Sequence, residues 1–529
     1  MISASRQPCD DAIVRSGTDV EDCRRPQARW VLAAAIIGSG ITFIDGTVVN
    51  IALPVLQVEL GASVSGAQWI VEAYALMLAS FILVGGSLGD RLGRRRVFMT
   101  GAAIFGAASI WCGLAPDLIN LIISRTVQGL GAALLVPGSL ALISANFSKA
   151  LRGRAIGTWS GVTAIAAGIG PVFGGWLVTN FSWRLIFLIN VPLVAAVLII
   201  SWFRVPESRD ESSTGHIDWS GAALVTLGLG GIVFGLIESN GQSFRSVRII
   251  LSFLIGAVAL AGFFLVEWRK KDPMMPFELF SSSTFSGANL LTLFLYSALG
   301  GMMFFLPFNL IQVQGYAPAA AGAAFLPFVI TMFLLSRWAG GLVDRYGSKI
   351  PLIVGPLITA AGFALFALPG TDVRSFWTSF FPAIMLMSIG MSTAVAPLTT
   401  TVMGAVSEQH AGVASGINNA VSRAAALIAV AVFGSIMLAV FSAGLTQRLE
   451  SLPLQNEERQ QILSRTVDLV NIQMPSDMDA SATSAISAAV RESFVSGFRY
   501  VSLTASGLAI LSAIAAGLMI DGKPAGPKA

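Results

Sequence analysis

The sequence predicts an all-α membrane protein whose helices cross the bilayer many times. Of its 529 residues, 54% are hydrophobic and only 12% are charged, and the mean hydropathy is +0.75. A soluble chain of this length would carry far more charge. A second observation is a short, basic, glycine-rich motif that occurs at 85–97 and again at 340–349. This repetition indicates that the chain is built from two related halves.

The individual spans are predicted from apolar segments of roughly 20 residues, the length that crosses a ~30 Å hydrocarbon core. We place fourteen of them, at 30–55, 66–88, 96–114, 118–143, 154–178, 184–203, 217–237, 247–267, 285–313, 318–342, 350–368, 376–402, 411–440 and 494–520. Lys and Arg gather in alternate connections, as the positive-inside rule requires of cytoplasmic loops. We therefore expect both termini in the cytoplasm and the chain in the inner (cytoplasmic) membrane.

The spacing of the repeated motif predicts the domain organisation. The offset of 254 residues exceeds the roughly 180–200 that six helices and short loops need, so two extra helices should lie between two six-helix bundles. The predicted parts are a tail 1–29, an N-terminal bundle 30–205, the extra helices and linker 206–275, a C-terminal bundle 276–520 with an external loop 444–492, and a tail 521–529. In that loop, Leu463, Val467 and Val470 have the spacing of one helix face. We interpret the loop as an external cap without chemistry.

Ionisable side chains inside three predicted spans are the first candidates for function. An acid such as Asp45 costs about 2.5–3.5 kcal/mol near the membrane centre on insertion scales. Counted from the outer ends of their helices, Asp45 and Arg125 lie at similar depths, ~15 Å and ~11 Å. Glu72 lies near the same layer. The pair could simply fix helix packing. Alternatively, because burial favours a protonated carboxyl and a neighbouring arginine favours an ionised one, Asp45 could take up and release a proton.

Four motifs identify a family. The repeated loop has the pattern G-x-L-x-D-R-x-G-R-[RK], and the others are D-x-T-x-V-N-x-A-L-P from Asp45, R-x-x-Q-G-x-G from Arg125 and G-P-x-x-G-G from Gly170. Together they resemble the major facilitator superfamily, specifically its fourteen-helix drug:proton antiporter branch (EmrB/QacA type), from Trp30 to Ile520. The resemblance implies a major facilitator fold with two six-helix bundles plus two linker helices.

The resemblance, together with the ionisable and polar residues inside the spans, suggests roles for individual residues. We assign proton coupling to Asp45, Arg125 and Glu72, and a substrate cavity to Asn50, Gln128, Asn418, Asn419 and Arg423. A conformational latch would use Gly86, Asp90, Arg91, Gly93, Arg94, Asp344 and Arg345, with Asp90 facing the start of the helix near Ala411. The antiporter signature of the fifth helix would be Gly170, Pro171, Gly174 and Gly175, where two glycines allow close packing and the proline interrupts the hydrogen-bond ladder.

These features predict a proton-coupled secondary exporter of hydrophobic compounds, with multidrug efflux as the leading interpretation. The alternatives are a dedicated exporter of one metabolite, antibiotic or lipid, with an anion held by Arg423, and a transport-inactive sensor or scaffold. The sequence contains no phosphate-binding G-x-x-x-x-G-K-[ST] loop, so ATP is not expected as the direct energy source. We expect no enzymatic activity, cofactor, metal or nucleic acid; the partners would be the lipid bilayer, protons, a hydrophobic substrate and a possible periplasmic adaptor. A lipophilic monocation could compete with the proton at Asp45.

Overall fold

The computed structural model describes residues 26–147, 149–209, 218–239, 246–270, 273, 275–371, 375–406, 411–472 and 480–521, and all of their regular structure is helical. The elements are α2 (Pro26–Glu59), α3 (Val64–Leu92), α4 (Arg94–Gly113), α5 (Leu118–Asn146), α6 (Lys149–Asn180), α7 (Leu185–Leu188), α8 (Asn190–Arg204), α9 (Trp219–Glu238), α10 (Val247–Arg269), η2 (Phe277–Ser281), α11 (Ser283–Phe308), η3 (Asn309–Val313), α12 (Pro318–Ala323), α13 (Leu326–Gly340), α14 (Leu342–Tyr346), α15 (Lys349–Leu365), α16 (Phe376–Ser379), α17 (Phe381–Gly404), α18 (Ala411–Glu450), α19 (Asn456–Ser464), η5 (Thr466–Asn471) and α20 (Ala480–Met519).

Thirteen helices of the described chain are long and apolar enough to cross a membrane. The remaining predicted span, 350–368, forms α15, whose 17 residues are an apolar helix just short of that length. Two predicted spans are much longer than expected, since α18 and α20 each have 40 residues. At 1.5 Å per residue such a helix is about 60 Å long, twice the thickness of the hydrocarbon core.

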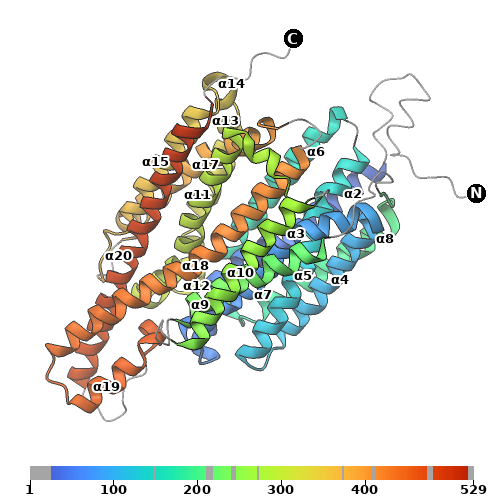
Figure 1. Ribbon diagram of the computed structural model, residues 1–529. Helices are drawn as coiled ribbons and strands as arrows, with labels where there is room; N and C mark the ends of the chain where they lie inside the picture. Colours follow the sequence, from blue (N-terminus) through green and yellow to red (C-terminus); the bar gives the residue numbers. More distant parts are fainter. Residues whose placement is uncertain are drawn as a thin grey trace, which may run out of the picture.

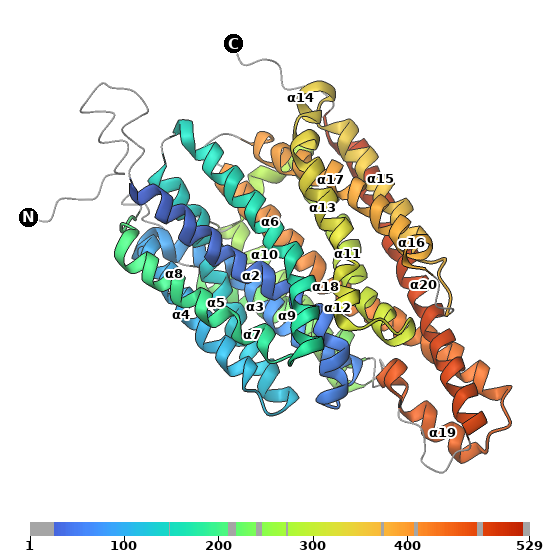
Figure 2. The same cartoon turned by 180° about the vertical axis from the view of Figure 1, so that it is seen from behind.

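The helices form two bundles that lie side by side (Figures 1 and 2). In the first bundle α2 packs on α5, α6 and α8, and α3 and α4 both pack on α5. In the second, α11 packs on α18 and α20, and α15 packs on α17 and α20. The start of α2 and the end of α20 lie at one end of the molecule, which we call the termini end, and α19 lies at the other, the hairpin end.

The additional helices α9 and α10 pack on each other and lie against both bundles, because α9 contacts α3 as well as α18. Leu229, Val233 and Ile237 of α9 form one apolar cluster with residues of α18. Near the hairpin end, Ser65 of α3 donates a hydrogen bond to the Ile237 carbonyl (3.2 Å), and Ser435 of α18 donates one to the Leu236 carbonyl (3.2 Å). α9 therefore connects the two bundles.

Beyond the bundles, α18 and α20 continue as a projecting pair of helices. Apolar side chains hold this pair together, and Arg448 of α18 forms an ion pair with Glu492 of α20 (3.1 Å). The segment predicted as an external loop with one apolar helix face, 444–492, therefore consists largely of helix in its described part. Its η5 folds back onto α2, where Gln57 donates to the Asp468 carbonyl (3.3 Å).

The two bundles also contact each other directly near the hairpin end. Gln312 donates to the side chain of Gln57 (3.2 Å), and Gln68 of α3 donates to the Val430 carbonyl of α18 (2.8 Å). The backbone N–H of Ala319 donates to Thr179 of α6 (3.0 Å). These contacts close the bundles against each other at that end.

Candidate functional site

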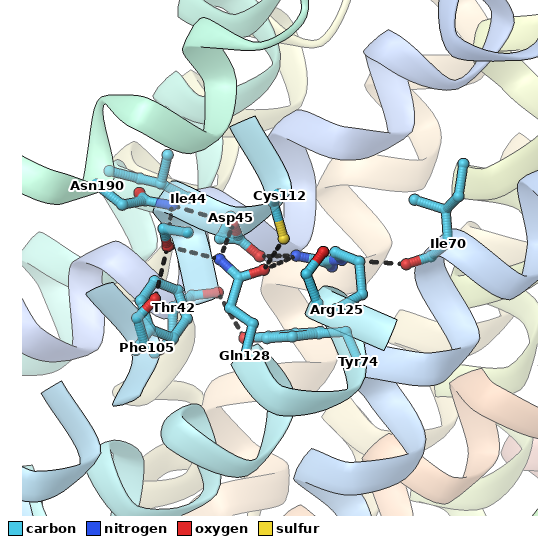
Figure 3. Close-up of polar contacts among 12 residues, drawn as sticks. Thr42, Ile44, Asp45, Ile70, Tyr74, Phe105, Cys112, Arg125, Gln128 and Asn190 are labelled. Carbon is cyan, nitrogen blue, oxygen red and sulfur yellow. Dashed lines mark hydrogen bonds and ion pairs between the residues drawn. The ribbon is translucent and has the colours of Figure 1, made fainter. Parts of the chain in front are cut away.

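A network of polar side chains lies inside the first bundle, centred on Asp45 of α2 (Figure 3). Asp45 is 0% exposed and forms an ion pair with Arg125 of α5, which is 1% exposed. The other carboxylate oxygen accepts from the amides of Gln128 (2.9 Å) and Asn190 (3.1 Å). The Gln128 oxygen in turn accepts from Arg125 (2.6 Å). The predicted depths of Asp45 and Arg125 thus correspond to a direct contact.

The other face of Arg125 is occupied as well. Its Nε donates to the Ile70 carbonyl of α3 (3.0 Å), and its guanidinium carbon lies 4.3 Å from the ring centroid of Tyr74. The Tyr74 hydroxyl donates to the Thr42 carbonyl of α2 (3.3 Å). A buried ion pair offsets its desolvation only when its remaining donors and acceptors are satisfied. Both oxygens of Asp45, and the Nε and one terminal nitrogen of Arg125, have partners here, whereas the side-chain oxygen of Asn190 has none among the described residues. A cationic substrate cannot reach Asp45 in this conformation, because the carboxylate is enclosed.

Sequence reasoning missed three members of this network. Asn190 of α8 donates to Asp45, and Ser109 of α4 accepts from Gln128 (2.9 Å). The thiol of Cys112 lies 3.5 Å from the Gln128 oxygen. Isolated polar residues in apolar segments, such as Asn190 just before Val191-Pro192, were the available signal, but it does not identify their partners.

Glu72 does not join this network. It is 0% exposed, and neither carboxylate oxygen has a hydrogen-bond partner among the described residues. Ile70 and Tyr74 face the network, whereas Trp69 donates to Glu238 of α9 (3.2 Å) and Gln68 contacts α18. Because residues three and four apart share a helix face, Glu72 belongs to the side of α3 that faces α9 and α18. The layer of three ionisable groups expected from the sequence is therefore divided between two sites.

The glycine signature of α6 lies between Asp45's helix and the second bundle. A Cβ at Gly170 would lie 2.3 Å from the hydroxyl of Thr47, and one at Gly174 would lie 2.0 Å from Val48. On the opposite face, a Cβ at Gly175 would lie 2.3 Å from the Pro318 carbonyl of α12. Likewise, a Cβ at Gly322 of α12 would lie 2.1 Å from the Pro171 carbonyl of α6. Close packing therefore links α2 to α6 and α6 to α12.

The residues assigned to a substrate cavity do not converge. Asn418 donates to Thr292 of α11 (2.7 Å) inside the second bundle, and Asn419 is exposed and donates to its own helix. Gln128 belongs to the Asp45 network, and the buried side-chain oxygen of Asn50 has no partner among the described residues. Arg423 alone reaches the other bundle, and its placement is described next.

Arg423 of α18 points toward α2. Its guanidinium carbon lies 6.0 Å from the ring centroid of Phe43. The Nε of this half-buried side chain has no hydrogen-bond partner among the described residues. Arg423 is therefore a cation at the interface of the two bundles, facing a residue of α2 that is two positions from Asp45.

The first copy of the repeated loop forms a tight turn between α3 and α4. Gly93 has φ +108°, and a Cβ there would lie 2.7 Å from the carboxylate of Glu207. Glu207, which sequence reasoning did not select, accepts from the backbone N–H groups of Arg95 (2.9 Å) and Arg96 (3.2 Å) and so caps α4. Position 93 therefore requires glycine for two reasons: the positive φ disfavours other residues, and a side chain would clash with the Glu207 carboxylate.

The other latch residues of this loop are placed as follows. Asp90 pairs with Arg94 (2.8 Å), Arg91 is half-buried, and Gly86 of α3 packs near Pro137 of α5. Residues 407–410, which precede α18, lie outside the described residues, so the expected contact between Asp90 and that helix start stays a prediction.

The second copy keeps the turn but not the continuous helix. Gly347, the counterpart of Gly93, has φ +72°. Unlike α3, however, the second copy is divided into α13 and α14. Arg345 is exposed, while the side chain of Asp344 lies outside the described part.

The lengths, apolar composition and two-bundle arrangement of these helices define a polytopic membrane protein. The sequence matches the Major Facilitator Superfamily over residues 35–430, and the chain belongs to that family. It is 34% identical to the multidrug resistance protein Stp of Mycobacterium tuberculosis (strain CDC 1551 / Oshkosh), over 83% of this chain and 81% of that protein. It is also 34% identical to the tetracenomycin C resistance and export protein of Streptomyces glaucescens, over 77% and 75% of the two chains.

Solved structures support the same fold at low sequence identity. A bacterial homologue of the human lysosomal transporter Spinster, inward-facing and unoccupied, matches with a TM-score of 0.64 at 18% identity, covering 93% of this chain and 98% of that chain. A peptide transporter, POT, in complex with sulfate matches with a TM-score of 0.60 at 12% identity, covering 98% and 100%.

Proposed function

We propose that the protein is a secondary active exporter that moves hydrophobic compounds, drugs among them, outward in exchange for protons. The observation that carries this proposal is the enclosed Asp45–Arg125 pair, in which a carboxylate sits 0% exposed inside a transporter fold. The relatives named for multidrug resistance and for tetracenomycin C export support the direction and class of cargo.

Protonation of Asp45 would change the balance of forces in the network. A neutral carboxyl attracts Arg125 far less, so the guanidinium would be held mainly by its remaining partners, the Gln128 oxygen and the Ile70 carbonyl. The same stretch of α2 carries Thr47, which donates to the Ala167 carbonyl of α6 (2.9 Å). A shift of α2 would therefore reach α6 and, through Gly175, α12 of the second bundle. This route connects proton binding to a rearrangement of the bundles.

We further propose that the chain is of the fourteen-helix antiporter type and lies in the inner membrane with the termini end in the cytoplasm. Arg95 donates to the Val205 carbonyl (3.2 Å), and Arg204 lies 5.8 Å from the ring of Trp30 near the start of α2, so the arginines of 91–96 belong to the termini end. The positive-inside rule then makes that end cytoplasmic and the projecting α18–α20 pair external.

One alternative cargo has an observation in its favour. Arg423 is a cation at the interface between the bundles, with an Nε that lacks a partner among the described residues. An anionic metabolite or antibiotic could bind there. Transport of such a cargo should fail in Arg423→Ala, whereas transport of a lipophilic cation should not.

The decisive experiment is proton-driven export by Asp45→Asn in reconstituted vesicles. The amide nearly preserves the volume of the carboxyl but cannot exchange a proton, so export under an imposed pH gradient should fall to the level of empty vesicles. Binding of the same cargo should persist, which shows that the variant is folded. The matched control is Glu278→Gln, at an exposed carboxylate.

Other outcomes of that experiment would redirect the proposal. Unchanged, pH-dependent export by Asp45→Asn would contradict a coupling role for Asp45 and make Glu72 the next candidate. Absence of any export by the wild-type chain, across a panel of dyes and antibiotics, would favour a sensor or scaffold.

A further inference from the structure

We propose a second, peripheral binding site, for organic monocations with an apolar body, in a pocket at the hairpin end between α3, α5, α9 and η5. The pocket has a volume of about 340 Å³ and is separate from the Asp45 network. Its lining includes Trp69, Glu238, Leu118, Ile122, Val467 and Ser63. This volume lies at the lower end of the range for small-molecule sites, roughly 300–1,000 Å³.

The chemistry of the lining selects positive charge. Glu238 ends α9, so its carboxylate adds to the negative end of that helix. None of the ion pairs in the described part of the chain involves Glu238. A second acid, Asp117, immediately precedes Leu118 in the chain but is not itself part of the lining. Hydrogen bonds from the backbone and side chain of Asn120 keep the pKa of Asp117 below its ordinary value.

The position of Trp69 suits an aromatic contact with such a cation. Its ring N–H donates to Glu238 (3.2 Å), and its ring centroid lies 6.0 Å from that of Phe234. Both contacts restrict the indole while it lines the pocket. An indole face beside a carboxylate attracts quaternary ammonium and similar delocalised cations. Leu118, Ile122 and Val467 supply apolar contact for the rest of the ligand.

The site borders elements that hold the two bundles together. Ser65, another residue of the lining, donates to the Ile237 carbonyl of α9. Val467 belongs to η5, which is hydrogen-bonded to Gln57 of α2. A cation in the pocket would therefore contact α3 and α5 of the first bundle, α9 and η5 together. In the orientation proposed above, the pocket faces the release side of the exporter; the binding site itself does not depend on proton coupling.

The test measures local charge and occupancy at one introduced thiol. Val467→Cys is made in a chain whose Cys9, Cys23 and Cys112 are changed to Ser, reconstituted in nanodiscs. A methanethiosulfonate transfers its thioalkyl group to the thiolate introduced at position 467 and releases methanesulfinate. At each position we compare the labelling rate of the cationic trimethylammonium-ethyl reagent with that of the anionic sulfonatoethyl reagent. Because the site is anionic, this rate ratio should be about tenfold larger at position 467 than at the exposed control Ser464→Cys.

Ethidium, a lipophilic monocation, then tests occupancy. It should slow labelling of the thiol at position 467 in a saturable manner, with an apparent Kd that rises about tenfold in Glu238→Gln and in Trp69→Leu. Trp69→Leu should leave the reagent preference in place, since it removes no charge, and Glu278→Gln should change nothing. Equal reagent rates, or ethidium protection that survives Glu238→Gln, would overturn the proposal.

Two further arms separate the source of the cation and the dependence on transport. In phosphatidylcholine nanodiscs, a lipid headgroup in the pocket would slow labelling before ethidium is added, whereas phosphatidylglycerol nanodiscs would not show this effect. Protection should persist in Asp45→Asn. Loss of coupling in that variant therefore bears on the exporter proposal alone, and loss of protection in Glu238→Gln bears on the pocket alone.

Discussion

At the scale of single residues, the Asp45 carboxylate is held by donors from two helices: Arg125 and Gln128 on α5 and Asn190 on α8, all directed at a residue of α2. Each donor forms a charge-assisted hydrogen bond to the carboxylate. An isolated charge in this apolar interior would cost several kcal/mol. The network lowers that cost without exposing the carboxylate to water, so the loss of any one donor should alter export.

Gln128→Ala tests this dependence. The substitution removes one hydrogen bond to the carboxylate and one acceptor of Arg125, each a contribution of roughly 1.5 kcal/mol or more, so the rate of export should fall about tenfold or more. The measurement is the initial rate of dye export from vesicles under an imposed pH gradient. Asn180→Ala, which removes an exposed amide from α6, should leave this rate unchanged. An unchanged rate for Gln128→Ala would mean that this amide does not act on the coupling step.

The sequence allowed the Asp45–Arg125 contact to be predicted because both residues are ionisable groups in apolar spans, and helix geometry fixes their depths. It could not place Glu72 relative to them. The depth of a residue follows from the sequence, because each helical residue adds a fixed rise along the axis. The direction of the Glu72 side chain does not, because it depends on how α3 is rotated against α5, α9 and α18. Nor could it select Asn190 or Glu207. Their roles depend on tertiary contacts, of Asn190 with the Asp45 carboxylate and of Glu207 with the start of α4.

At the scale of elements, α6 is in contact on both sides near its glycine signature. Thr47 and Val48 of α2 lie against one face and Pro318 of α12 against the other. The close approach needs residues without a side chain at these positions, so packing here is set by backbone shape. The G-P-x-x-G-G motif predicted close packing correctly, but only the structure identifies the two neighbours.

Gly174→Ala should therefore be destabilising. Its Cβ would lie 2.0 Å from Val48, which forces α2 and α6 apart at a typical cost of about 1–3 kcal/mol. We expect a lower Tm of the purified protein and reduced export. Val48→Ala should restore part of both in the double variant, because it removes the methyl group that clashes. Gly161→Ala on the same helix has open space around its Cβ and serves as the control.

The docking of η5 on the hairpin end should depend on pH through Asp468. Partial burial raises the pKa of this carboxyl, against an opposing effect of Arg465. The docked state thus favours the protonated form: docking is strongest below the ordinary carboxyl pKa, near 3.9, and weakens as pH rises through the raised value. A spin label at Ser464→Cys should become more mobile over that range. Asp468→Asn should abolish the trend, while Glu457→Gln should preserve it.

At the scale of the whole molecule, the two bundles are joined at the hairpin end by α9, by the Gln57–Gln312 contact and by the packing of α6 on α12. Two bundles with one closed end suit a transporter that opens its ends alternately. The two-bundle plan and the number of apolar segments could be predicted from the repeated loop and the hydropathy. The extent of α18 and α20 could not, because their polar continuation is stabilised by the contact of each helix with the other rather than by lipid.

If the exporter must open at the hairpin end to release its cargo, fixing that end shut should stop transport. Gln57→Cys and Gln312→Cys, in a chain without other cysteines, place two thiols where the wild-type side chains lie 3.2 Å apart. A short, membrane-impermeant bis-methanethiosulfonate added outside intact cells should crosslink them and reduce export to background, with recovery after reduction.

The matched control for this crosslink joins Thr284→Cys to Asp521→Cys. The wild-type side chains at these positions are hydrogen-bonded within the second bundle at the termini end. That pair should not react from outside, and when it is crosslinked in opened vesicles export should continue. Crosslinking of the control pair from outside would reverse the proposed orientation, and undiminished export through a crosslinked 57–312 pair would exclude opening at the hairpin end as a step of transport.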